Sequence, residues 1–419
     1  MKVPSQSTIV MSEFIKSGVA FHNAGLLSEQ RKLVEEAFKA GLLKFIVSTP
    51  TLALGVNLPA NTVLISSIYR YSGFGMVPLT TMEIRQMMGR AGRPKYDEEG
   101  TAVLIARNER EESYIRDRYI DGDPEPIASR FNNEIAVRKY VLALICTGFY
   151  PKKGDISRFF SALFASYSGL DFSILIDESI EFLLDNLFIE SSKGVLSATL
   201  IGRLINSLYL DPLTGAIFLR FSKEAATKES VPEISVLHAV SCSQEFKFIH
   251  ISQAEFTKYE EESYDLNLMV DQNLVDYEKF ISAIKLSRIF EDWISEKSER
   301  YLEEEYGVTP GEFYSMMENF IWLINAMARI SAYSGYKSTY ISKLGLRLRY
   351  GVKEELLPLV AVPGIGRVRG RRLFNSGIKS LNGLRSVSLQ RLSALLGEKT
   401  GEKVFKYLHV TKNDKATLV

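Results

Sequence analysis

The sequence predicts a chain of mixed class, in which an amino-terminal α/β domain with a parallel sheet precedes domains that are mainly α-helical. In residues 1–126, three β-branched apolar runs alternate with helical patterns: KFIVST at 44–49, TVLISS at 62–67 and TAVLIA at 101–106. Apolar strands that alternate with helices are typical of a buried parallel sheet. Beyond residue 126, apolar residues recur mostly at helical spacing, which favours helical domains.

Two further segments of the α/β domain carry clear local signals. LSEQRKLVEEAFKAG (27–41) predicts a helix with Ser28 as its N-cap and Gly41 just past its end. SIYRYSGFGMVPL (67–79) predicts a β-hairpin, because two strand-like halves flank a glycine-containing turn. The aromatic residues of this hairpin are Tyr69, Tyr71 and Phe74. Exposed aromatics at a hairpin tip can stack on a terminal base pair, although an ordinary surface hairpin would fit the same pattern.

The domain organisation follows from length and from changes in pattern. A chain of 419 residues has room for about three domains of roughly 150 residues each. DGDPEPIAS (121–129) is rich in Pro and Asp and predicts a linker. We expect an α/β domain at 1–126, a small helical domain with a β wing at 127–225, a longer helical domain at 226–352 and a small basic domain at 353–419. In the second of these, GVLSAT and GAIFLRF are strand-like.

Composition narrows the class of protein. The chain is 46% hydrophobic and 24% charged, which is ordinary for globular proteins. Its two cysteines lie far apart, its four histidines lack metal-site spacing, and no apolar run approaches the ~20 residues of a membrane span. We therefore expect no disulfide framework, no metal centre and a cytoplasmic location. An acidic block at 255–305 and a basic block at 343–385 are either two solvated faces or a sign that one surface meets a polyanion.

The motif STPTLALGVNLPA (48–60) has the residues of a phosphate-handling loop. It places Thr49 and Thr51 where a strand ends, at the edge of a parallel sheet where ligands bind. Hydroxyls and backbone N–H groups suit phosphate oxygens. Gly55 permits close backbone approach, and Asn57 offers an amide to a sugar hydroxyl. Taken alone, the motif also fits a turn that leads into a helix.

A second motif, QMMGRAGRPKYD (86–97), strengthens the first. It combines Gln86 with two arginines, Arg90 and Arg93, that stand next to glycines. Glycines let the backbone come close to a phosphate, and guanidinium groups can bind its oxygens in pairs. The two motifs together indicate a nucleotide-facing edge of the sheet.

The clearest helix is VTPGEFYSMMENFIWLINAMARISAYSG (308–335). Thr309, Pro310 and Glu312 predict its start, and Gly335 its end. Its expected core stripe is Phe313, Met316, Met317, Phe320, Ile324, Met327 and Ile330. Ser315, Trp322 and Arg329 recur every seven residues on a neighbouring face. Trp322 could therefore stack a base beside a phosphate-binding Arg329, or it could pack into the core.

The carboxyl-terminal segment LVAVPGIGRVRGRRLFNSGI (359–378) has a helix–hairpin–helix pattern. Its Pro-Gly-Ile-Gly sequence turns the chain, and N–H groups at the start of the next helix can hold a phosphate. Arg367, Arg369, Arg371 and Arg372 add positive charge. Gly370 lowers the stability of the helix slightly. We expect this segment to bind nucleic acid.

Three motifs, FHNAGL (21–26), STPTLALGVNLPA and QMMGRAGRPKYD, resemble those of the second RecA-like domain of superfamily 2 helicases. The amino-acid sequences of these motifs are most similar to those of the Ski-type branch, and within it to those of the archaeal Hjm-type DNA repair helicases. The resemblance covers essentially the whole chain. It implies a RecA-like motor domain, then winged-helix, helical ratchet and helix–hairpin–helix domains.

The resemblance also implies roles for individual residues. Arg90 and Arg93 would contact the γ-phosphate of ATP, with Gln86, Gly55 and Asn57 lining the same site. His22, Thr49 and Thr51 would lie near the nucleic-acid backbone. The hairpin with Tyr69, Tyr71 and Phe74 would part the duplex, and Trp322 would lie under the single strand.

The largest departure from that family is a missing phosphate-binding motif; smaller ones are Ser315, where family members carry a basic residue, and Gly370, where the motif usually has Ala. The sequence contains no G-x-x-x-x-G-K-[ST] motif, so ATP and Mg²⁺ would require a further motor domain. ILIDES (174–179) ends in two acids, but its apolar residues follow helical spacing. We expect the chain to belong to a monomeric 3′–5′ helicase that acts on single-stranded and forked DNA. Because the chain has only the second motor domain, we expect it to be inactive alone. A non-catalytic DNA-binding module and a Ski-type RNA helicase are the alternatives.

Overall fold

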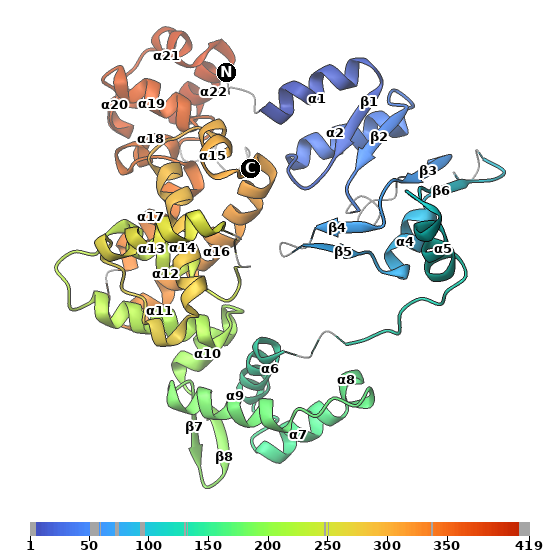
Figure 1. Cartoon of the computed structure of the whole chain (residues 1–419). Helices are drawn as coiled ribbons and strands as arrows, with labels where there is room; N and C mark the ends of the chain where they lie inside the picture. The colour runs from blue at the N-terminus through green and yellow to red at the C-terminus, as the bar shows by residue number, and fades with distance from the viewer. Residues whose placement is uncertain are drawn as a thin grey trace. The chain divides into compact units, whose positions relative to one another are not determined.

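A computed structural model of the chain shows two compact units, which are described separately (Figure 1). The first contains residues 1–129 and 307–315, and the second contains residues 130–306 and 316–419. The structure describes residues 6–50, 58, 60–71, 75–92, 97–129, 131, 133–246, 249, 251–336 and 338–409.

The first unit begins with a parallel strand pair packed on two helices. The elements are α1 (Gln6–Lys16), β1 (Val19–His22), α2 (Ser28–Lys39) and β2 (Phe45–Ser48), and β1 pairs with β2 in parallel. Met11, Ala20 and Val34 are among the residues of its core. Gly41 follows α2 with φ +73°, as expected, but the N-cap is Leu27 and not Ser28. The reason is that the Gln30 side chain accepts the Leu27 N–H at 2.9 Å, so the helix begins one residue earlier.

A second parallel pair joins β3 (Thr62–Ile65) to β6 (Thr101–Leu104). Between them lie β4 (Tyr69–Tyr71), β5 (Met76–Pro78) and α4 (Thr81–Met88), and after them α5 (Glu109–Ile115) and η1 (Arg116–Ile120). The antiparallel β4–β5 pair confirms the predicted hairpin. The parallel pairing of the early strands is also confirmed, but among the described residues the two pairs do not join into one sheet.

The expectation that these strands are buried is wrong for part of the sheet. Phe45 and Val47 of β2 are 66% and 67% exposed, and Leu64 of β3 is 60% exposed. Helices α1 and α2 pack mainly on β1, the other strand of the pair. The apolar runs therefore predicted the strands correctly, but the prediction that both faces of these strands are buried was wrong.

Residues 307–315, which include the start of α16 (Pro310–Tyr333), belong to the first unit. The N–H of Gly311 donates to the carbonyl of Gly25 at 3.0 Å. A Cβ atom at Gly311 would lie 2.4 Å from the carbonyl oxygen of Ala24. The loop of the FHNAGL motif is therefore in backbone contact with a position that only glycine fits.

The second unit opens with helices and a β-hairpin. These are α6 (Glu134–Thr147), α7 (Lys153–Ser161), α8 (Phe164–Tyr167), α9 (Ser173–Asp185), β7 (Ile189–Ser192), β8 (Val195–Ala198) and α10 (Leu200–Ser207). The antiparallel β7–β8 pair confirms GVLSAT as a strand, and α9 confirms that ILIDES is helical.

The prediction for GAIFLRF is wrong, because this segment lies in α11 (Pro212–Ala225). Asp211 caps the helix by accepting the Leu213 N–H at 2.7 Å, and Pro212 occupies its first turn. Residues 214–219 of α11 are all buried, and exposed polar residues, Arg220, Lys223 and Glu224, occur only in its second half. A continuous buried run of this kind shows no helical period, so its sequence looks like a buried strand.

The remaining helices of this region are α12 (Glu233–Ser241), α13 (Gln253–Asp265), η2 (Gln272–Leu274), α14 (Tyr277–Ile294), α15 (Glu299–Tyr306), α16 and α17 (Ser338–Tyr350). We call residues 233–350 the helical region. Phe290 of α14 and Phe320 of α16 pack with ring centres 4.0 Å apart. The bounds of α16 agree with the predicted helix.

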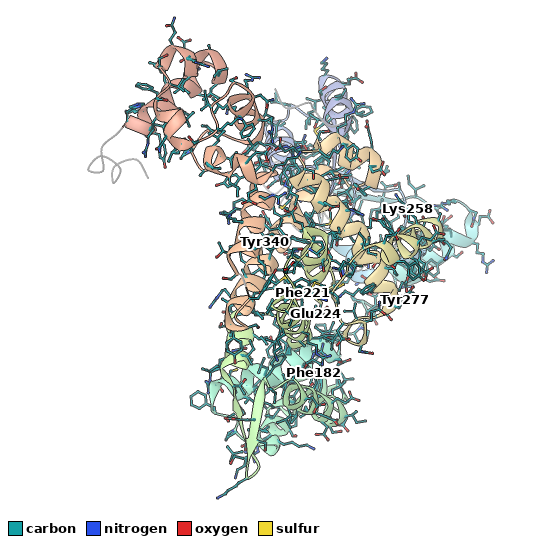
Figure 2. All side chains as sticks on the ribbon, turned by 90° about the vertical axis from the view of Figure 1, so that its left-hand side faces the viewer. Phe182, Phe221, Glu224, Lys258, Tyr277 and Tyr340 are labelled. Carbon is teal, nitrogen blue, oxygen red and sulfur yellow. The ribbon has the colours of Figure 1, made fainter. Side chains whose placement is uncertain are left out.

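A buried polar network ties α6 to α11. The guanidinium of Arg138 donates to the carboxylate of Asp211 at 3.0 Å and lies 5.0 Å from the ring centre of Phe182, which Figure 2 labels. The carboxylate of Glu245 accepts the Asp211 N–H at 2.7 Å and the Thr214 hydroxyl at 2.6 Å. Burial raises the pKa of both carboxyl groups. Breaking this network would leave buried polar groups without partners, so we expect it to fix the junction of α6 and α11.

The chain ends in a small domain with its own core, which we call the C-terminal domain. It contains η3 (Glu354–Leu356), α18 (Leu357–Val360), α19 (Arg367–Asn375), α20 (Leu381–Arg385), α21 (Leu389–Leu396) and α22 (Glu398–His409). Leu359, Leu373, Leu392 and Val404 are fully buried within it. The α18–turn–α19 arrangement is that of the predicted helix–hairpin–helix.

Candidate functional site

The carboxyl ends of β1 and β2 bring together two of the residues predicted to lie near nucleic acid. The N–H of Thr49, which is exposed, donates to the carbonyl of His22 at 3.3 Å. The ring of His22, however, is 5% exposed, and its Nε2 lies 3.1 Å from the Glu35 carboxylate on α2. The ring therefore packs against Glu35 within the unit, and its proximity to a nucleic-acid backbone stays a prediction. Thr51, Gly55 and Asn57 lie outside the described residues.

The second motif starts on α4 and continues in a tightly packed turn. Gln86 is exposed on the helix, and Arg90 follows its end half-buried. The N–H of Gly92 donates to Ala60 at 2.8 Å, and a Cβ on Gly100 would lie 2.3 Å from the nitrogen of Gly92. The glycines therefore allow backbone-to-backbone packing that fixes this turn. Arg93 lies outside the described residues.

The predicted strand-parting hairpin is fastened to the start of α4. Arg70 of β4 forms an ion pair with Glu83, which also accepts the N–H and hydroxyl of Thr80, each at 2.9 Å. Burial opposes the charge on Glu83, but the Thr80 and Arg70 contacts prevail and lower its pKa. Tyr71 is 65% exposed and Tyr69 is half-buried, while Phe74 lies outside the described residues.

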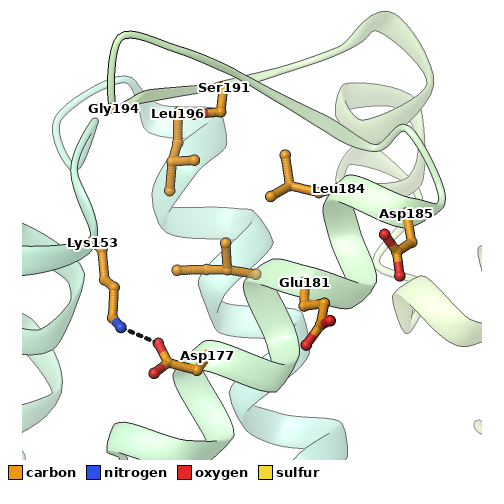
Figure 3. Close-up of a pocket in the computed structure, with 9 residues that line it drawn as sticks. Lys153, Asp177, Glu181, Leu184, Asp185, Ser191, Gly194 and Leu196 are labelled. Atoms are coloured by element: carbon orange, nitrogen blue, oxygen red, sulfur yellow. Dashed lines mark ion pairs between the residues drawn. The ribbon is translucent and has the colours of Figure 1, made fainter.

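The hollow between α9 and the β7–β8 hairpin does not fit a nucleotide. The hollow in Figure 3, about 440 Å³, lies between α9 and the β7–β8 hairpin. Three carboxylates line it, from Asp177, Glu181 and Asp185, and Lys153 pairs with Asp177 at 2.5 Å. This negative lining would repel a phosphate chain. Across the described ranges, no group of three or more His, Cys, Asp or Glu could hold a metal ion.

Helix α16 presents the face that the sequence indicated. Thr309 and Glu312 are joined at its start by a hydroxyl-to-carboxylate bond of 2.5 Å. Phe313, Phe320, Ile324, Met327 and Ile330 of the predicted stripe are at most 1% exposed. Trp322 is 36% exposed, and Ser315 and Arg329 are also exposed. The indole N–H of Trp322 donates to the carbonyl of Leu208 at 3.3 Å, which leaves part of the ring open to solvent.

The hairpin of the C-terminal domain turns at Gly364, whose φ is +89°. Gly370 is buried where α19 crosses α18, and a Cβ there would lie 3.0 Å from Val360. This close approach offsets the cost of a glycine within a helix. The four arginines divide by exposure: Arg369 and Arg372 are exposed, whereas Arg367 and Arg371 are half-buried.

Sequence reasoning missed a second hairpin in the same domain. Gly397, Gly401 and Val404 repeat Gly366, Gly370 and Leu373 at one constant spacing, and Phe405 likewise repeats Phe374. Gly401 is packed like Gly370, because a Cβ there would lie 2.7 Å from the Cα of Ser393. A search for this internal repeat would have found the pair of helices α21 and α22.

Three protein-family models match parts of the chain. "Helicase conserved C-terminal domain" matches residues 3–95, "Archaeal helicase, domain 4" matches 234–351, and "DNA polymerase-iota, thumb domain" matches 361–409. The matches therefore include STPTLALGVNLPA, most of QMMGRAGRPKYD, nearly all of the helical region and most of the C-terminal domain.

Similar proteins come from several archaea. Proteins named "ATP-dependent DNA helicase Hel308" are 35% identical over 410 residues in Methanocella arvoryzae and 36% identical over 417 residues in Pyrococcus abyssi. A third, from Thermoplasma acidophilum, is 35% identical over 404 residues. Each match covers 95% of this chain but only 55% to 57% of the relative, so the chain spans little more than half their length. Among the described residues, no helix is long and apolar enough to cross a membrane.

Proposed function

Since this chain belongs to the family of the archaeal Hel308 DNA helicases, we propose that it forms the ATP-responsive and DNA-handling part of a 3′–5′ DNA helicase that acts on forked DNA. In this proposal residues 1–126 are a second RecA-like domain, 127–225 a winged-helix domain, 226–352 a ratchet domain and 353–419 a helix–hairpin–helix domain. The observation that carries the DNA-handling role is the exposed Trp322 on a helix whose neighbouring stripe is buried.

ATP and Mg²⁺ would be shared with a P-loop domain, which this sequence does not contain. Gln86 is exposed, and Arg90 lies in a turn fixed by Gly92 and Gly100, which suits a residue that must meet a phosphate in one geometry. With Arg93, these side chains would bind and orient the γ-phosphate, and Gly55 and Asn57 would line the site. ATP, when bound, supplies the free energy of hydrolysis for translocation.

The DNA strand would run along α16 as a monomeric helicase moves. Trp322 would stack on a base, and Arg329, one heptad further, would hold a phosphate. Thr49 and Thr51 would bind the backbone at the motor domain. The β4–β5 hairpin, with Tyr69, Tyr71 and Phe74, would part the duplex.

The test is ATP hydrolysis in the presence of single-stranded DNA. Arginine fingers accelerate hydrolysis by ~10³–10⁵, but only of a nucleotide already held with its metal. We expect no measurable hydrolysis by the 419-residue chain, and hydrolysis when a P-loop domain of a relative is added. Arg93→Ala should abolish that activity, whereas Arg110→Ala, an exposed arginine elsewhere in the first unit, should not. Turnover by the chain alone that depends on Arg93 would contradict the proposal.

A second candidate is a DNA-binding module without catalysis, which the absence of a P-loop in the sequence favours for the chain taken alone. An RNA substrate is the third candidate. The likeness of residues 361–409 to a DNA polymerase thumb domain supports DNA. Competition between DNA and RNA single strands of equal sequence for the chain would decide between them.

A further inference from the structure

The four arginines of α19 do not act as one group. Arg369 and Arg372 are exposed, and each donates to a backbone carbonyl inside the C-terminal domain: Arg369 to Gly364 at 3.1 Å and Arg372 to Leu395 at 2.9 Å. Arg367 and Arg371 are one helical turn apart and half-buried, and both contact the end of α14. The helix thus has an arginine pair toward solvent and another toward the helical region.

Arg371 is held by two carboxylates. Its Nε donates to Glu296 at 2.8 Å and its Nη2 donates to the same carboxylate at 2.5 Å, a bidentate pair. Nη2 also lies 2.9 Å from the Glu355 carboxylate. The Glu296 side chain is only 14% exposed, so water screens this pair weakly.

Glu296 occupies an unusual backbone position for its side chain. It follows the end of α14 with φ +73°, in the left-handed region where glycine is the usual residue. Besides Arg371, its carboxylate accepts the backbone N–H of Lys353 at 3.2 Å, at the start of the C-terminal domain. Burial would raise the pKa of this carboxyl group, but the contacts from Arg371 and Lys353 lower it overall. A glutamate in a conformation unfavourable to it is consistent with a role for its side chain.

Arg367 packs on a buried tryptophan. Its guanidinium carbon lies 4.4 Å from the ring centre of Trp293, which is 6% exposed. It also donates to the carbonyl of Lys297. The indole N–H of Trp293 donates to Leu348 at 2.7 Å, and Gly351 lies so close that a Cβ there would be 2.5 Å from the ring. The ring is therefore fixed and offers Arg367 a rigid surface.

We propose that Arg367 and Arg371 are positioning residues: with Trp293 and Glu296 they form a latch that fixes the C-terminal domain on the helical region. Arg369 and Arg372 are the arginines of α19 that meet phosphates. The second statement rests on the proposed function, whereas the latch itself concerns the free protein.

Charge supports this division of roles. A phosphate that approached Arg371 would meet the carboxylates of Glu296 and Glu355, both within 3 Å of the guanidinium. By contrast, the bonds that Arg369 and Arg372 make are to neutral carbonyl groups. The latch would then set the position at which the hairpin and this exposed pair meet a strand that leaves α16.

The experiment compares Glu296→Gln, Arg371→Gln and Arg369→Gln in the 419-residue chain. Amide hydrogen exchange in peptides covering 293–297 and 351–356 reports docking, because the Lys353 N–H is bonded to Glu296. Loss of either latch partner should speed exchange there by roughly 2-fold to 100-fold, the range for residues in one network. Arg369→Gln should leave it unchanged.

Binding of a single-stranded oligonucleotide across a salt series gives the second readout. A lost phosphate contact lowers the slope of log K against log salt by about 0.7 for single strands. We expect this change for Arg369→Gln but not for Arg371→Gln, and Glu296→Gln should lower affinity as Arg371→Gln does. If Arg371→Gln lowers the slope and Glu296→Gln raises affinity, Arg371 contacts DNA and the proposal is overturned.

A double-mutant cycle separates the latch from simple packing. Exchange in Glu296→Gln combined with Arg371→Gln should be no faster than in the faster single variant, since the two side chains act through one contact. Exchange in the double variant that is faster by the product of the two single effects would count against the latch. If the unaltered chain shows no salt-dependent DNA binding, the proposed function fails, and the exchange measurements still decide whether the latch exists.

Discussion

The two tryptophans of the chain, Trp293 and Trp322, sit in opposite surroundings within the second unit. Both donate an indole N–H to a backbone carbonyl, Trp293 to Leu348 and Trp322 to Leu208. Trp293 is 6% exposed and lies beneath Arg367, whereas Trp322 is 36% exposed on the same face of α16 as Arg329. One tryptophan is therefore packed between the helical region and the C-terminal domain, and the other lies on a solvent-exposed helix face. The two residues differ in what covers their rings, because their indole N–H groups make the same kind of bond.

The largest effect should come from removing the buried ring. Trp293→Ala should lower the free energy of unfolding by ~3–5 kcal/mol, since it leaves a cavity between α14, Gly351 and Arg367. Chemical denaturation followed by circular dichroism measures this loss. Trp293→Phe, which keeps an aromatic ring, should cost clearly less, and a Trp293→Ala variant of unchanged stability would break the comparison.

His238, which is buried against α14, the helix that carries Trp293, should make the free energy of unfolding fall at acidic pH. Burial lowers the pKa of His238 to about 4, although its bond of 2.9 Å to the Phe280 carbonyl on α14 opposes the shift. Its usual pKa is about 6.5, so the stability that neutral His238 contributes is present above pH 6.5 and is lost as pH falls toward 4. The full loss is about 3 kcal/mol, at about 1.4 kcal/mol for each pH unit between the two values.

The measurement is the free energy of unfolding of the chain and of His238→Gln between pH 7 and 4. Their difference isolates this histidine from buried acids such as Asp211 and Glu245, whose raised pKa values act in the opposite direction. We expect the curve of the variant to be flatter. Parallel curves would show that His238 has the same pKa in the folded and the unfolded protein, and would contradict this prediction.

Removing the exposed ring should affect binding more than folding. Trp322→Ala should weaken single-strand binding by ~1–3 kcal/mol, with little preference for sequence, because every base has a π-face. Fluorescence anisotropy with labelled oligonucleotides measures this loss. Trp322→Phe keeps a ring but lacks the N–H that bonds Leu208, so it tests stacking separately from that bond. A Trp322→Ala variant with lower stability and normal single-strand affinity would show that Trp322, like Trp293, has a structural role.

The smallest effect should come from Arg329. If it holds one phosphate, Arg329→Gln should lower the slope of log K against log salt by about 0.7 for single strands. Arg349, an exposed arginine on α17, provides the matched control, and its replacement should leave the slope unchanged. Equal slopes for both variants would place the strand elsewhere on the helical region.

Local signals in the sequence predicted those elements whose ends and faces are determined nearby. Helix α16 was predicted with its observed bounds because Thr309, Pro310 and Glu312 mark its start and Gly335, with φ +77°, follows its end. The seven-residue spacing predicted that Ser315, Trp322 and Arg329 share a face, whereas it left open whether Trp322 packs into the core, and the structure shows that all three are exposed. By contrast, α11 was mistaken for a strand, because residues 214–219 are all buried and show no helical period on which such a prediction could depend.

The sequence alone could not show that the arginines on α19 have different roles. Helical spacing places Arg367 and Arg371 on one side, but the partners that define that side, Trp293 and Glu296, lie in a distant segment of the chain. His22 was likewise expected near nucleic acid, and only the folded chain brings Glu35 to its ring. A local sequence pattern does not predict contacts between segments that are far apart in the chain.

The left-handed backbone at Glu296 has a consequence for protein engineering. A design method that scores only local backbone preference would choose Glu296→Gly, because glycine relieves the strain at φ +73° and is the preferred residue after a helix end. The same substitution would remove the partner of Arg371 and the acceptor of the Lys353 N–H. At position 296, backbone preference and long-range side-chain contacts therefore favour different amino acids.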